Sequence, residues 1–133
     1  MKNLIQTSLL ALAVILSLNF ALVAKGNSTV KNFENSEKTL LSAIDSENMG
    51  LSISSIQVLG ELNSVKAVLP LLKVLHTNNS EEARIAASVS LYKIGDSRGI
   101  YAVKMASKYD SSERVRKICE KVYSQYLREN KVT

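Results

Sequence analysis

The sequence is poor in residues that interrupt helices and in residues that build catalytic or metal sites. It has one proline and five glycines, and only one cysteine and one histidine. A single cysteine excludes an intramolecular disulfide, and a single histidine cannot supply a typical zinc site. No glycine-rich phosphate loop and no serine nucleophile motif occurs. We therefore expect no metal, no cofactor and no enzymatic activity, and a domain held together by packing alone.

The residues that are abundant favour an all-α domain. Hydrophobic residues make up 46% of the 133 residues and charged residues 22%, which are values typical of globular proteins. Helix formers dominate, and apolar and polar residues do not alternate as they do in a strand. Short polar breaks carry possible helix caps at Asn79, Asp96 and Asp110. The pattern predicts six helices, at about residues 36–45, 50–62, 65–76, 80–94, 97–109 and 111–129.

The N-terminus predicts a signal peptide over residues 1–26. Lys2 precedes an apolar run at residues 8–24, and small and polar residues follow that run. We expect cleavage near Gly26 and a periplasmic or secreted protein. The alternative is a retained inner-membrane anchor, although the run is at the lower limit for a spanning helix. Residues 27–35 are polar and predict a disordered lead-in to a domain over residues 36–130.

The sequence resembles itself at a spacing of about 32 residues. At this shift ELNSVKAV, residues 61–68, aligns with KIGDSRGI, residues 93–100, and Leu59 aligns with Leu91 and then with Tyr123. The repeating unit is a pair of helices, present nearly three times. One such pair cannot bury its own apolar face, so stacked pairs are expected to share a continuous core.

This pattern resembles the HEAT-repeat family, especially the short HEAT-like units of the phycobilisome-lyase type. Residues 59–75 and 81–100 carry the resemblance, and residues 110–127 match more loosely. The resemblance implies a right-handed α-solenoid of about three helix pairs, whose curved surface is lined mainly by the second helix of each pair. It implies no reaction. Pro70 departs from a regular helix and predicts a bend or a late helix start.

Two arginines recur one repeat apart. Arg84 lies near the start of a helix that is otherwise rich in small apolar residues, and it aligns with Arg116. A charge that recurs with the unit favours a structural role over a catalytic one. We expect these arginines to bond acceptors in the turns, namely Asp96 or Asp110, and carbonyl oxygens at helix ends. Such bonds would form a ladder between repeats that sets their register.

The C-terminal half of the chain is basic. Residues 84–133 contain 11 basic and 5 acidic side chains, against 4 and 7 in residues 27–83. In the last helix Lys117 and Lys121 replace Ile85 and Val89 of the preceding repeat, which predicts a polar cap on the array. The same surface is a candidate site for an acidic protein partner. Its candidate residues are Tyr92, Lys104, Lys108, Arg114, Lys117 and Lys121.

These patterns favour a non-catalytic protein-interaction or scaffold module. The alternative is an accessory or regulatory subunit of an enzyme or sensor complex, anchored in the membrane by the uncleaved N-terminus. Nucleic acid is not expected as a partner, because acidic residues lie between the basic ones. Among the tyrosines, Tyr101, Tyr123 and Tyr126 align with apolar positions of other repeats and are predicted to pack, whereas Tyr92 and Tyr109 are predicted to be partly exposed.

Overall fold

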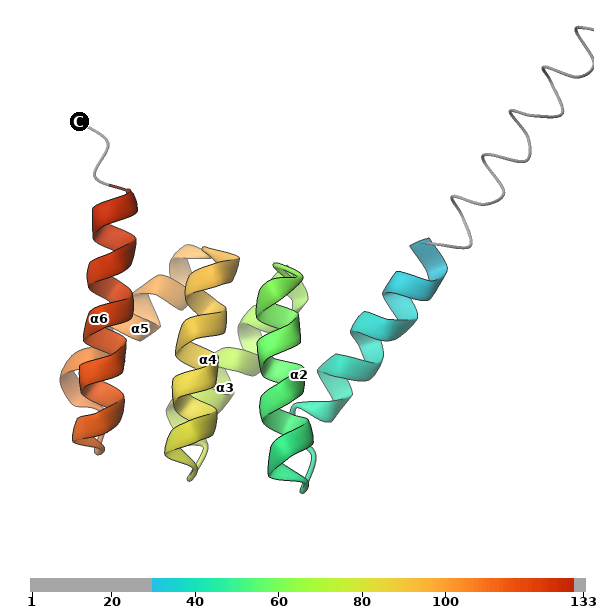
Figure 1. Ribbon diagram of the computed structural model, residues 1–133, viewed down its shortest axis with the longest axis horizontal. Coiled ribbons are helices and arrows are strands. Elements are labelled where there is room, and N and C mark those ends of the chain that lie inside the picture. Colours follow the sequence, from blue (N-terminus) through green and yellow to red (C-terminus); the bar gives the residue numbers. More distant parts are fainter. Residues whose placement is uncertain (1–29, 131–133) are drawn as a thin grey trace, which may run out of the picture. The chain divides into compact units, whose positions relative to one another are not determined.

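The computed structural model describes residues 30–130, so the predicted signal peptide lies outside the described range. A helix over residues 30–43 comes first. It is followed by α2 (Met49–Glu61), the 3-10 turn η1 (Val65–Ala67), α3 (Val68–Thr77), α4 (Glu81–Ile94), α5 (Ser97–Tyr109) and α6 (Glu113–Glu129) (Figure 1). The described residues contain no strand. The prediction of six helices in an all-α fold is confirmed.

The predicted lead-in, residues 27–35, lies partly outside the described residues. Its described part, residues 30–35, is helical and continues into the helix that ends at residue 43. Their side chains are all exposed, so they add nothing to the core, as their composition indicated. A helix forms its own backbone hydrogen bonds, and propagation from an existing helix is much easier than nucleation. An exposed polar segment can therefore remain helical. No helix in the described residues is both long and apolar enough to cross a membrane.

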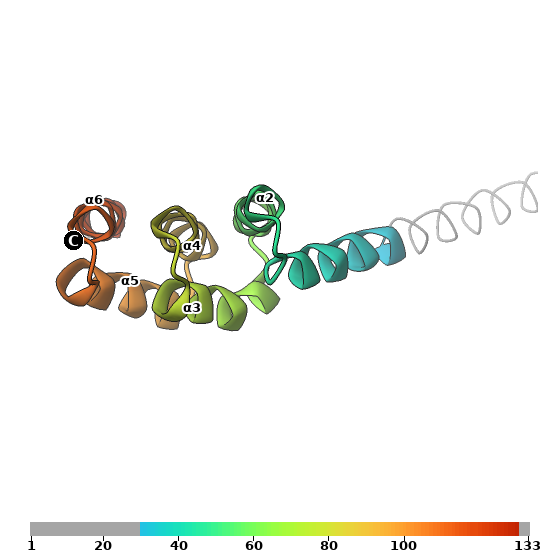
Figure 2. The ribbon, with the colours of Figure 1, turned by 90° about the horizontal axis from the view of Figure 1, so that it is seen from below.

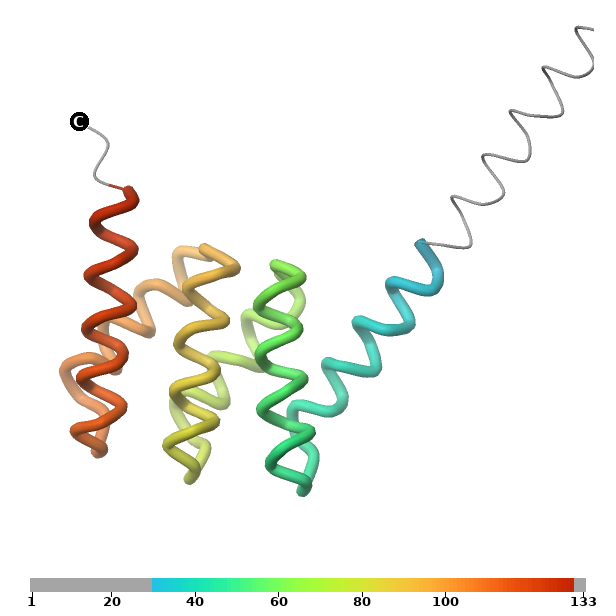
Figure 3. The backbone as a smooth tube through the Cα atoms, in the orientation of Figure 1, coloured from blue at the N-terminus to red at the C-terminus, as the bar shows by residue number. Residues whose placement is uncertain are grey.

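A compact unit that begins at Glu37 contains the solenoid. Its helices lie in two layers (Figure 2). One layer, here called the second-helix layer, contains α2, α4 and α6, which run in the same direction (Figure 3). The other contains α3 and α5. Contacts join α2 to α4, α4 to α6 and α3 to α5. Each helix pair thus packs on its neighbour in the chain, which is the arrangement of a solenoid.

The core lies between the two layers. Helices α2 to α6 all contribute buried side chains, including Leu59, Leu75, Leu91, Val103, Val115 and Cys119, and Ile44 adds one from the turn before α2. The predicted small-residue face of α4 is buried at Ala83, Ala86 and Ala87. Burial raises the pKa of the Cys119 thiol. A thiol in this environment stays protonated at neutral pH and is a poor nucleophile.

Helices α2 and α4 approach closely at Gly60. A methyl group on Gly60 would lie 2.6 Å from the Oγ atom and 2.8 Å from the Cα atom of Ser90. The Ser90 hydroxyl, buried in this contact, donates to the carbonyl oxygen of Ile56 at 2.9 Å. Glycine is therefore required here for close helix packing, and the hydroxyl of Ser90 finds its acceptor on the backbone of the neighbouring helix.

Two local predictions had different outcomes. Helix α3 begins at Val68, after the 3-10 turn, so Pro70 lies in its first turn, where a missing N–H costs little. The late helix start is confirmed.

The predicted packing of Tyr101 is wrong, because its side chain is 63% exposed. Leu69, its counterpart in the preceding repeat, is 64% exposed. The alignment of these two positions therefore identified a repeated surface position.

Candidate functional site

The turns before α2, α4 and α6 repeat the same hydrogen bonds at a spacing of 32 residues. In each turn a side-chain oxygen accepts from the backbone N–H two residues later: Ser46 from Asn48, Asn78 from Ser80, and Asp110 from Ser112. The later residue then caps the helix by accepting from a first-turn amide. The predicted caps Asn79 and Asp110 are wrong, since Ser80 and Ser112 hold those positions and Asp110 instead shapes the turn.

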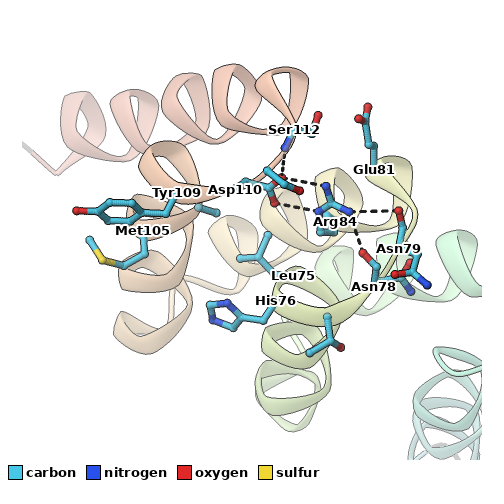
Figure 4. Close-up of a pocket in the computed structure, with 13 residues that line it drawn as sticks. Leu75, His76, Asn78, Asn79, Glu81, Arg84, Met105, Tyr109, Asp110 and Ser112 are labelled. Carbon is cyan, nitrogen blue, oxygen red and sulfur yellow. Dashed lines mark hydrogen bonds and ion pairs between the residues drawn. The ribbon is translucent and has the colours of Figure 1, made fainter.

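A buried ion pair joins the last two turns (Figure 4). Arg84 on α4 donates from Nε and Nη2 to the two carboxylate oxygens of Asp110, with both distances 2.9 Å. Its Nη1 donates to the carbonyl oxygens of Asn78 at 2.8 Å and Asn79 at 3.3 Å. The side chains of Arg84 and Asp110 are only 10% and 7% exposed. The guanidinium therefore connects the turn before α4 to the turn before α6.

Arg116 makes the same backbone contacts one repeat later. Its Nη1 donates to the carbonyl oxygens of Asp110 at 2.6 Å and Ser111 at 3.2 Å. Asp96 is not part of this cluster, because it is paired with Arg98 at 2.9 Å and caps α5. Hydrogen bonds from Arg98 lower the pKa of Asp96 to about 2. Of the four residues predicted for the ladder, Arg84, Arg116 and Asp110 meet and Asp96 lies elsewhere.

The ionisation of Asp110 depends on its partners. Burial by itself acts to raise the pKa of this carboxyl group. The hydrogen bonds from Arg84 and from the Ser112 amide, with the nearby Arg116 charge, outweigh burial and lower the pKa below its ordinary value of 3.8. The donors around it thus keep the carboxylate charged to a lower pH than the ordinary pKa of an aspartate would give.

A hollow of about 570 Å³ lies beside the buried pair, with His76, Met105 and Tyr109 on its wall (Figure 4). Every buried side-chain nitrogen and oxygen of the described residues has a hydrogen-bond partner. The described residues also hold no group of three or more His, Cys, Asp or Glu side chains that could bind a metal ion. Arg84 and Asp110 bond each other and the turns, which is the geometry of a structural contact.

A more apolar groove, of about 610 Å³, lies in the second-helix layer between α2 and α4. Ile53 and Gln57 line it from α2, and Ile85 and Val89 line it from α4. The three apolar side chains are only partly buried, so each presents some of its surface to solvent. A groove with an apolar floor is suited to receive apolar side chains from another molecule.

Two ion pairs border this groove and cross from repeat to repeat. Lys93 on α4 pairs with Glu61 on α2. Arg114 on α6 pairs with Glu82 on α4 at 2.7 Å and approaches Glu81 at 3.7 Å. Both principal pairs join residues that are 32 positions apart. These pairs were not predicted from the sequence. The available signal was the occurrence of opposite charges at equivalent repeat positions, since the aligned segments place Glu61 opposite Lys93.

The six residues predicted to bind a partner do not form one cluster. Arg114, Lys117 and Lys121 line a common hollow at the start of α6, where Lys117 also pairs with Glu113 at 2.6 Å. Lys104 on α5 lies 5.8 Å from the ring centre of Tyr123, and Lys108 is exposed on the same helix. Tyr92 is partly buried and donates to Glu129 at 2.5 Å. Of the six residues, only Arg114 on α6 lines the groove between α2 and α4.

Comparison with known proteins agrees with this architecture. No curated protein matches the chain. The family model for HEAT repeats matches residues 37–123, which covers well over half of the chain and begins where the compact solenoid unit begins. Repeats of this family generally mediate protein–protein interaction or scaffolding and are typically non-catalytic. The 32-residue helix pairs, their stacking in two layers and the family match lead to one conclusion: this chain belongs to the HEAT-repeat family.

Proposed function

We propose that the protein is a non-catalytic interaction module that binds a protein partner in the groove between α2 and α4. The observation that carries this proposal is the partly exposed apolar floor formed by Ile53, Ile85 and Val89. Large apolar side chains left partly accessible in a groove favour association with apolar groups of a partner. The solenoid displays the groove on packed helices, so little order has to be created on binding.

The charges near the groove indicate which partner fits. Glu61 and Glu82 already have basic partners, so the acidic side of the groove is neutralised. Farther along the same layer, Lys121 is exposed on α6 and forms no ion pair with the described residues. The partner segment that we propose has apolar side chains for the groove and acidic side chains directed toward α6. Such complementarity acts mainly on the rate of association and on specificity.

Val89→Glu is expected to weaken partner binding at least about 10-fold, because it places a carboxylate on the apolar floor of the groove. The partner is captured from the native extract with the wild-type protein at low salt, and its affinity for both proteins is then measured by titration. Tyr101→Glu is the matched control, since Tyr101 is an exposed apolar residue of the other layer. A partner whose affinity falls with Tyr101→Glu but not with Val89→Glu would place the binding surface elsewhere.

We also propose that the protein is exported to the periplasm after signal-peptide cleavage. The support is the positively charged start followed by the apolar run at residues 8–24. N-terminal sequencing of the protein from the periplasmic fraction is expected to begin within residues 25–27. A protein that begins at Met1 and fractionates with the inner membrane would contradict cleavage and would favour the membrane-anchored accessory subunit.

A further inference from the structure

An apolar stripe lies on the free side of α2. Leu51, Val58 and Leu62 are 49%, 41% and 39% exposed. The opposite side of α2, with Ile53, Ile56 and Gly60, faces α4, as the bond from Ser90 to the Ile56 carbonyl shows. With 3.6 residues per helical turn, the three stripe residues point roughly opposite to the α4 contact. No described helix of the second-helix layer packs on this side.

The repeat shows what this side of a second helix is built to receive. A shift of 32 residues moves Leu51 onto Ala83 and then onto Val115, both of which are fully buried. The same shift moves Val58 onto Ser90, which packs against α2. In α4 the position of Ser90 thus holds the helix against the preceding second helix, and α6 contacts α4 in turn. The stripe on α2 is therefore the corresponding helix-packing surface, and the described residues contain no preceding helix of the second-helix layer to cover it.

The charges on the two ends of the array indicate which helix fits the stripe. Helix α2 contains no basic residue, and its one acidic residue, Glu61, is paired with Lys93. The outer side of α6 instead carries the exposed polar residues Lys117, Glu120 and Ser124. Packing the stripe against α6 of another copy would bury these polar groups at a desolvation cost. If two α2 helices pack together, the apolar side chains of one stripe contact those of the other. No unpaired charge of α2 is then buried.

We propose that two copies of this chain associate through their α2 helices about a twofold axis. The interface is isologous, so each stripe packs on the other and the assembly closes as a dimer. It extends the second-helix layer across the axis, with the two α2 helices antiparallel. The polar outer side of α6 then forms both ends of the assembly, which prevents further growth.

Sedimentation of the protein at increasing concentration tests the proposal. The chain from Asn27, which retains every residue of the described core, is expected to dimerise with a dissociation constant on the order of micromolar, as befits a small interface. Val58→Lys is expected to raise that constant at least about 30-fold, since it introduces a charge into the centre of the contact. Leu69→Lys is the control, because Leu69 is equally apolar and more exposed but lies on α3.

Cross-linking supplies a second readout that does not depend on a disruptive substitution. Ser54 is exposed beside the stripe near the middle of α2, and the native Cys119 is buried. Ser54→Cys is expected to form a covalent dimer with a short bifunctional maleimide, whereas Leu69→Cys is not. A chain that stays monomeric at about 100 times the expected dissociation constant would overturn the proposal. Equal weakening of the dimer by Val58→Lys and by the control Leu69→Lys would also overturn the proposal.

Discussion

Replacement of Arg84 by methionine is expected to lower the free energy of unfolding by about 3–5 kcal/mol. The change leaves the Asp110 carboxylate, 7% exposed, without the cation that holds both of its oxygens. It also removes the donor shared by the carbonyl oxygens of Asn78 and Asn79. For a domain of this size we expect the melting temperature to fall by more than about 12 °C. Chemical and thermal unfolding measure both quantities.

A second substitution separates the buried charge from the loss of packing. Adding Asp110→Asn to Arg84→Met is expected to recover at least about 1–2 kcal/mol, because it removes the uncompensated charge. The amide can still accept from the Ser112 N–H, as Asn78 does from Ser80 one repeat earlier. If Arg84→Met instead abolished partner binding with unchanged thermal stability, Arg84 would belong to a binding surface and the structural role would be wrong.

The pH dependence of the Arg84→Met effect gives an independent check. In the wild type the pKa of Asp110 is lowered, so its charged form stabilises the fold above about pH 4 and that contribution is lost as the pH falls through 3.8 and below. In the variant, burial of Asp110 is no longer opposed by Arg84, and the pKa rises. Acidification then neutralises the buried carboxyl, so the stability difference between the two proteins is expected to narrow as the pH falls.

Gly60→Ala is expected to destabilise the protein by about 1–3 kcal/mol, even though alanine is the better helix former. Its methyl group would lie 2.8 Å from the Cα atom of Ser90, so backbone has to move and the α2–α4 contact has to open. Urea unfolding measures the change. Since the groove is formed by the same two helices, we also expect weaker partner binding from this variant.

Gly50→Ala in the same helix is the matched control. Its added methyl group would meet only the Asn48 side-chain oxygen, at an ordinary 3.4 Å. We expect a neutral effect or a gain of up to about 1 kcal/mol from helix propensity. Equal destabilisation by the two alanines would show that helix propensity or capping, and not the close approach of α2 to α4, governs the result.

The sequence was sufficient for the fold because each repeat encodes it locally. Polar breaks mark the turns, and the matching of Leu59, Leu91 and Tyr123 identifies the unit that stacks. The same logic failed at Tyr101. A repeated apolar residue has the same appearance in sequence whether the repeats bury it or expose it, and only the packing of α3 and α5 distinguishes these cases.

The candidate site was harder to predict, since its residues combine short-range and cross-repeat contacts. Recurrence of Arg84 at Arg116 indicated a structural cluster, but the choice between Asp96 and Asp110 depended on turn geometry. Asp96 is held by Arg98, two residues away. The basic residues of the last two helices were predicted to share one surface, whereas Lys104 lies near the Tyr123 ring and Arg114 pairs with Glu82.

The ion pairs across the groove make the repeats non-interchangeable. Glu61 and Lys93 occupy one position of the unit in successive repeats, and Glu82 and Arg114 occupy another. A tandem duplication of the central unit would oppose lysine to lysine and glutamate to glutamate. Each opposition would add, at the new junction, a repulsion of up to about 1 kcal/mol at an exposed site, while the two original pairs would remain on either side of it. The order of the units is thus encoded in their charges, and an array lengthened from within would need compensating substitutions at both positions.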